Sequence, residues 1–349
     1  MTDFEKLDNP CPPATDGKIA ALNLESMWRR AWIRFSEDAG RPGAAEALAD
    51  MERMKVQFLG DMDALGRLEA LAFQFDKIDG SYRAALVQAE AASAVHCFED
   101  ARNHLTRAMR MGAPNEIVEH QLLAIDQACG MAQDDILHAR YRIAATSAKL
   151  EDLIPLGALL ADLGRFAEAD VIYRQAIYSY SGISPFPLAW ACFQLGMLWG
   201  ELVPEPDLDL AAQWYRRAIT YLPGYAKARV HLAEIHISKG QPDDAEAILL
   251  PAASSGDPEI RWRLADLLTA QCRFEEAEIQ LDAARCGFDQ LLAKHPLAFA
   301  DHAAAFYASS GNDPQRALEL AQMNVANRPT RRAIKQAEEI SGMMSGAVK

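Results

Sequence analysis

Apolar residues recur at helical spacing along nearly the whole 349-residue chain, and no stretch alternates apolar and polar residues with the period of a strand. Short breakers separate these apolar stretches. They are Gly60, Gly80, Gly112–Pro114, Gly130, Gly164, Ser184–Pro187, Pro223–Gly224, Gly240, Gly256–Pro258, Pro296, Gly311–Pro314 and Pro329. Because short connections join helices that lie antiparallel to one another, the pattern predicts an all-α chain of helix pairs.

A two-residue motif, leucine followed by glycine or alanine, repeats in the second half of the chain, and we call it the small-residue mark. It appears as Leu156-Gly157, Leu195-Gly196, Leu232-Ala233 and Leu264-Ala265, at spacings of 39, 37 and 32 residues. Each mark is followed by a turn and by a second helix with residues at i, i+4 and i+7, which share one face. These second-helix sets are Ala169/Tyr173/Ala176, Ala211/Tyr215/Ala218, Ala245/Leu249/Ala252 and Ala277/Leu281/Ala284. The period indicates a repeat array, since one unit alone cannot bury its apolar face.

These marks resemble the tetratricopeptide repeat, with leucine-glycine in helix A and alanine, aromatic and alanine in helix B. The match is best over 150–185 and continues through 189–223, 226–258, 258–296 and 298–329, together about half of the chain. The resemblance implies an α-solenoid of antiparallel helix pairs, wound as a right-handed superhelix, in a bacterial-type cytoplasmic protein. We expect residues 1–16 to form a mobile arm, 17–148 a degenerate helical-repeat region, 149–329 about five repeats, and 330–349 a capping helix with a frayed end.

The resemblance also implies where a ligand would lie, because the family uses its concave, helix-A side. The positions that face this groove include Trp190, Phe193, Met197, Val230, Glu234, Trp262, Asp266, Phe299, His302 and Phe306. Large aromatic rings often anchor interfaces, although neighbouring helices could equally cover them, and the sequence leaves both possibilities open. Acids at Glu234, Glu259 and Asp266 edge the groove and favour an apolar protein or peptide partner that carries basic residues.

Composition narrows the class of partner. The chain has 35 basic and 49 acidic residues, a formal charge of −14, and this acidity disfavours nucleic acid and anionic membrane surfaces. The N-terminal residues contain no apolar signal stretch, and the six cysteines are scattered singly, so a reduced, cytoplasmic protein is expected. The sequence indicates neither the oligomeric state nor the identity of the partner.

No motif for catalysis was found. Glycine-rich phosphate loops and a nucleophile elbow are absent from the sequence, and acid pairs such as Asp134-Asp135, Asp243-Asp244 and Glu275-Glu276 fall at expected helix starts. We therefore expect no enzyme, no metal and no cofactor. The alternative is an enzyme or obligate enzyme subunit with a pocket in the N-terminal helices. It would rest on the aromatic and basic stretch 28–35 and on four residues that could bind a metal, namely His96, Cys97, His104 and His120.

Overall fold

The computed structural model describes residues 12–131 and 133–346, and over these ranges the chain is an all-α helical solenoid of 18 α-helices with no strand. The expected array of antiparallel helix pairs is confirmed. Most of the expected N-terminal arm, residues 1–11, lies outside the described residues, as do residues 347–349 at the C-terminus. The chain divides into two compact units, one of residues 1–20 and 140–223, the other of residues 21–139 and 224–349.

The first unit contains two helix pairs, each packed side by side. Its helices are α8 (Leu150–Asp162), α9 (Phe166–Ser179), α10 (Pro185–Met197) and α11 (Leu208–Tyr221), with a π-helical turn, η1 (Leu198–Leu202), after α10. The beginning of α1 (Gly17–Glu37) belongs to this unit, and Gly17 lies directly against the backbone at Tyr221. A Cβ at Gly17 would lie 2.2 Å from the Tyr221 carbonyl oxygen, so only glycine permits this approach.

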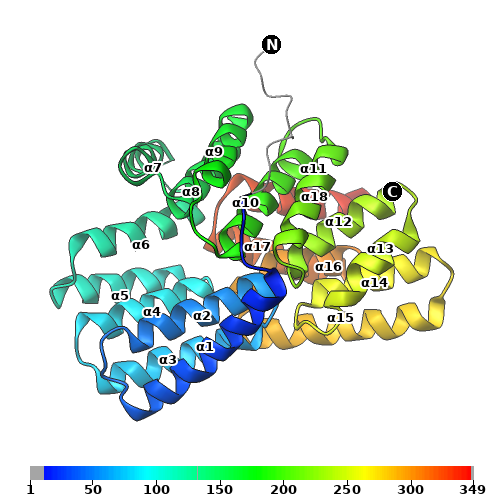
Figure 1. Ribbon diagram of the computed structural model, residues 1–349. Coiled ribbons are helices and arrows are strands. Elements are labelled where there is room, and N and C mark those ends of the chain that lie inside the picture. The colour runs from blue at the N-terminus through cyan, green and yellow to red at the C-terminus, as the bar shows by residue number, and fades with distance from the viewer. Residues whose placement is uncertain (1–11, 132, 347–349) are drawn as a thin grey trace. The chain divides into compact units, whose positions relative to one another are not determined.

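The second unit brings together two parts of the chain that are far apart in sequence. Its N-terminal helices are the remainder of α1, then α2 (Ala44–Leu59), α3 (Asp63–Ile78), α4 (Tyr82–Ala94), α5 (Phe98–Arg110) and α6 (Asn115–Ala128), blue to cyan in Figure 1, and the first half of α7 (Gln133–Ser147), up to residue 139. Its C-terminal helices are α12 (Ala226–Ser238), α13 (Pro242–Leu249) with the 3₁₀ turn η2 (Leu250–Ala252), α14 (Pro258–Ala270), α15 (Phe274–Lys294), α16 (Pro296–Ala308), α17 (Pro314–Asn327) and α18 (Arg331–Gly346).

Several contacts join these two parts of the second unit, including one ring contact and two hydrogen bonds. The Phe58 ring meets the Tyr225 ring edge-on at 5.5 Å between centroids, and the Gly256 amide donates to the Gly60 carbonyl at 2.9 Å. The backbone carbonyl of His96 accepts from Asn327 Nδ2 at 3.0 Å. The N-terminal helices are therefore packed against the later repeats of the same unit, an association that the periodic pattern does not predict.

Local sequence explains where many helices begin and turn. The acid pairs Asp134-Asp135, Asp243-Asp244 and Glu275-Glu276 lie in the first turns of α7, α13 and α15, where they complement the helix dipole as expected. Gly164 and Gly240 have φ of 76° and 70° at the turns that end α8 and α12, a left-handed conformation that favours glycine. None of the helices in the described residues is long and apolar enough to cross a bilayer.

Candidate functional site

The ten residues expected to line the groove lie on the A helices α10, α12, α14 and α16, and the structure divides them into two classes. The buried class contains Phe193, Met197, Val230, Trp262 and Phe306. The class that keeps part of its surface in solvent contains Trp190, Glu234, Asp266, Phe299 and His302. Only the second class can present atoms to a ligand without unpacking the core.

Trp262 and Phe306 belong to an aromatic block inside the second unit. Their ring centroids lie 5.5 Å apart in an edge-on arrangement, and Phe288 of α15 stacks on Phe306 at 4.8 Å. Trp262 is 3% exposed and Phe306 is fully buried. The sequence leaves open whether these rings are exposed or covered, and in the structure neighbouring helices cover them. The rings therefore stabilise the packing of α14, α15 and α16.

In the first unit, two of the three candidate side chains are likewise buried. The Phe193 ring packs against the Tyr215 ring with centroids 5.8 Å apart, and Met197, one turn further along α10, is also buried. Trp190 alone among the candidates of this unit remains partly exposed. The aromatic lining expected from the sequence therefore reduces to Trp190 in one unit and Phe299 in the other.

A chain of polar contacts crosses the A helices of the second unit. We call Glu234, Arg263, Asp266 and Ser310 the charged ladder. Arg263 bridges Glu234 of α12 at 2.5 Å and Asp266 of its own helix α14 at 3.4 Å. The Ser310 hydroxyl, just beyond α16, donates to Asp266 at 2.5 Å and accepts from Trp262 Nε1 at 2.9 Å. Charge-assisted contacts of this kind position the ladder, and burial raises the pKa of Asp266.

The second polar cluster surrounds His302 on α16. His302 Nδ1 lies 2.5 Å from a carboxylate oxygen of Glu259, and Asp301 binds Arg328 at 2.7 Å. Asp301 and then Glu259 raise the pKa of His302 to about 9, so the imidazole is protonated at neutral pH. Burial alone would raise the pKa of both carboxyl groups, yet the His302 charge holds each below its ordinary value. This cluster therefore carries fixed, paired charges.

Sequence reasoning missed two members of the ladder, Arg263 and Ser310. Arg263 follows a groove position by one residue, and its pairing depends on which residue of α12 lies opposite. Ser310 lies in the turn after α16, 48 residues from its donor Trp262. No signal at short range in the sequence identifies either contact.

The alternative site at the N-terminal helices does not assemble a metal-binding cluster within the described residues. No three of His96, Cys97, His104 and His120 place ligand atoms within 4.8 Å of one another. His96 Nδ1 instead lies 3.2 Å from the Leu297 carbonyl, and its ring stacks on Phe98 at 5.3 Å. His96 thus joins the turn before α5 to α16, which is a packing role.

Comparison with known proteins gives one family match and several structural likenesses. Residues 205–254 match the sequence profile of the tetratricopeptide repeat. No curated protein matches the chain. A crystal structure of YrrB, described as a tetratricopeptide-repeat protein with an unusual peptide-binding site, is 20% identical. The alignment covers 58% of this chain and 99% of that one, with a TM-score of 0.36.

Two further solved structures resemble the chain with similarly low sequence identities and TM-scores. A tetratricopeptide repeat protein from Parabacteroides merdae is 16% identical over 75% of this chain and 99% of its own, with a TM-score of 0.41. The Cut9–Hcn1 hetero-tetramer of the APC/C is 16% identical over 86% of this chain and 63% of its own, with a TM-score of 0.43. Such likenesses indicate nothing about a partner. Residues 205–254 therefore contain a tetratricopeptide repeat, and this repeat is set among helix pairs that carry the same small-residue marks.

Proposed function

We propose that this chain is an interaction scaffold that binds a partner protein or peptide segment along its A helices. The observation that carries the proposal is the exposed surface of α12, α14 and α16 in the second unit, where Phe299 and the charged ladder keep solvent-accessible atoms; in the first unit, Trp190 of α10 is partly exposed as well. Tetratricopeptide repeats generally serve as non-catalytic scaffolds, which supports the expectation that the chain is not an enzyme. We place this scaffold in the cytoplasm.

The same proposal assigns the parts of the chain. Residues 149–329 form the binding array of about five repeats, 17–148 form degenerate helical repeats that support it, and 330–349 cap the last repeat. Within the last part, α18 packs against α17 and has one apolar face, as a cap requires.

Charge and exposure specify the partner that we expect. Glu234, Asp266 and Glu259 supply three carboxylates, whereas Arg263 and the protonated His302 supply two positive charges. The surplus of negative charge favours an apolar segment flanked by lysine or arginine, with the apolar side chains against Phe299. A peptide array tests this specificity: basic peptides should bind more tightly than acidic ones, and the reverse order would refute it.

The experiment that tests the proposal is capture of the partner from the native cell by the tagged chain, followed by its identification. Trp190→Ala and Phe299→Ala should each lower recovery of that partner while leaving the helical circular dichroism unchanged, because both rings are partly exposed. Phe274→Ala is the matched control, since this ring is 63% exposed at the start of helix B α15 and lies off the proposed surface. Equal recovery with all three variants would overturn the proposal. Trp262→Ala is unsuitable as a test because that ring is buried.

A further inference from the structure

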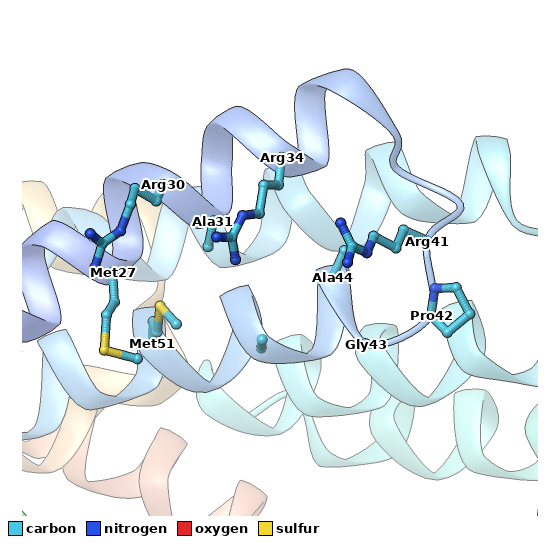
Figure 2. A pocket seen from close by; sticks show the side chains of 10 residues that line it. Met27, Arg30, Ala31, Arg34, Arg41, Pro42, Gly43, Ala44 and Met51 are labelled. Atoms are coloured by element: carbon cyan, nitrogen blue, oxygen red, sulfur yellow. The ribbon is translucent and has the colours of Figure 1, made fainter.

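A pocket of about 360 Å³ lies between α1 and α2, and none of its lining residues belongs to the A-helix surface described above. Met27, Arg30 and Arg34 of α1, Arg41 of the turn and Met51 of α2 line it (Figure 2), together with alanines of both helices. The alanines leave the space open because their side chains are short. The volume lies within the range of about 300–1,000 Å³ that small-molecule sites occupy.

Three arginines line this pocket. Arg30 and Arg34 stand one turn apart on α1, and the Arg34 and Arg41 guanidinium groups point into the space between the two helices (Figure 2). Among the residues that the structure describes, none of the three forms an ion pair, whereas Arg29 pairs with Glu25 on the same helix at 2.8 Å. Unpaired arginines gathered at one hollow are unexpected in a chain with 49 acids and 35 bases. They make the pocket a local positive region on an acidic protein.

The backbone at the start of α2 adds to the positive potential of the pocket. The helix α2 begins at the pocket, and its N-cap Gly43 has a φ of 81° and no capping side chain, although the Ala44 amide donates to the Arg41 carbonyl at 3.1 Å. The acid of this first turn, Glu46, is bound by Arg83 at 2.7 Å. A helix N-terminus without a capping side chain favours an anion, and guanidinium groups match the oxygens of phosphate and carboxylate.

We propose that this pocket binds a small organic anion. Its phosphate or carboxylate group lies between Arg34 and Arg41, and its short apolar part lies against Met27 and Met51, which stand together at one end of the pocket in Figure 2. Phosphate and carboxylate share the chemistry of an oxyanion, so the probes must separate them.

Calorimetric titration of the full chain with phenyl phosphate, benzoate, inorganic phosphate and phenol tests the proposal. Phenyl phosphate or benzoate should bind saturably at one site, and the tighter of the two identifies the preferred oxyanion, while neutral phenol should not bind. Arg34→Ala and Arg41→Ala should each weaken that binding by about tenfold, the typical loss of one charge-assisted contact. Met51→Ala should weaken binding of the aromatic anion but not of inorganic phosphate.

Arg29→Ala is the matched control, because it removes one exposed arginine from the same helix outside the pocket. It should change the affinity by less than about twofold, as expected of screened surface charge. The proposal is overturned if neither aromatic anion binds saturably. It is equally overturned if Arg29→Ala weakens binding as much as the pocket variants, since the effect would then be one of net charge alone.

Discussion

Gly157 of α8 lies under the ring of Tyr173 of α9, so that a Cβ on Gly157 would be only 2.5 Å from Tyr173 Cε1. The next repeat shows the same relationship, where a Cβ on Gly196 would lie 2.4 Å from Tyr215 Cε1. Later in the chain Ala233 shares a core cluster with Leu249. The size of the helix-A residue therefore complements that of the helix-B residue. This explains why glycine in helix A is matched by tyrosine in helix B, and alanine by leucine.

The first prediction concerns this packing. Gly157→Ala should lower the free energy of unfolding by about 1–3 kcal/mol, because the new methyl group overlaps the Tyr173 ring and a packed core yields little. Chemical denaturation followed by circular dichroism measures the change. Tyr173→Leu in the same chain should recover part of the loss, since a leucine accommodates alanine elsewhere in the array.

Gly66 provides the control for that substitution. It lies inside α3 with no atom within 4 Å of the position that a Cβ would take. Gly66→Ala should stabilise the chain by about 0.5–1 kcal/mol through helix propensity alone. Equal effects of the two substitutions would contradict the proposed role of the Gly157–Tyr173 contact.

The second prediction concerns Glu52, a carboxylate without exposed surface in α2. It accepts hydrogen bonds from Trp28 Nε1 at 2.7 Å, from Trp32 Nε1 at 3.0 Å and from Arg67 Nε at 3.1 Å. Glu52→Ala leaves two partly buried indole N–H groups and a guanidinium without this acceptor, and should cost about 3 kcal/mol of stability. Asp50→Ala, which removes an exposed acid paired with Arg53, should cost less than about 0.5 kcal/mol. Similar losses from both variants would show that Glu52 does not hold α1 to α2 and α3.

The third prediction is a loss of stability at alkaline pH. Asp301 and Glu259 raise the pKa of His302 from 6.5 to about 9 in the folded chain. Its stabilising effect is therefore fully present below pH 6.5 and is lost as the pH rises through about 9. Denaturation midpoints measured from pH 6.5 to 10 should fall for the unaltered chain more than for His302→Gln. A His302 imidazole that titrates at its ordinary pKa in an NMR experiment would rule this out.

The fourth prediction is that the stabilising effect of His96 is lost at acid pH rather than at alkaline pH. Burial first, and then the charge of Arg328, lowers its pKa from 6.5 to about 4. The neutral imidazole therefore contributes stability above pH 6.5 that is lost as the pH falls through about 4. The same NMR titration should show His96 still neutral at pH 5. A charged His96 at that pH would contradict its packing against α16.

The sequence predicts the helix pairs well, because helical periodicity and the small-residue marks both follow from how each pair packs. It does not predict the exposure of the candidate rings. The repeat pattern assigns Trp262 and Phe306 to the groove side of two A helices. It does not predict that Phe288 of α15 packs against both rings and covers them.

Long-range contacts limit the prediction in the same way. The contact between Phe58 and Tyr225, and the bond from Asn327 to the His96 carbonyl, join residues more than 160 positions apart. Two arginines of the α1–α2 pocket, Arg30 and Arg34, belong to the aromatic and basic stretch 28–35, whereas Arg41 lies outside it. Only the folded chain brings these arginines to one pocket, where none of them forms an ion pair with another described residue.

Site-specific photo-cross-linking tests most directly whether the A helices are the binding surface. A benzophenone amino acid would replace Glu234 of α12 or Phe299 of α16 in turn, and for comparison Ile279 of helix B α15, whose side chain is 66% exposed. With the partner identified by capture, the positions of Glu234 and Phe299 should cross-link to it, and the position of Ile279 should not. Cross-links from the position of Ile279 alone would contradict the account.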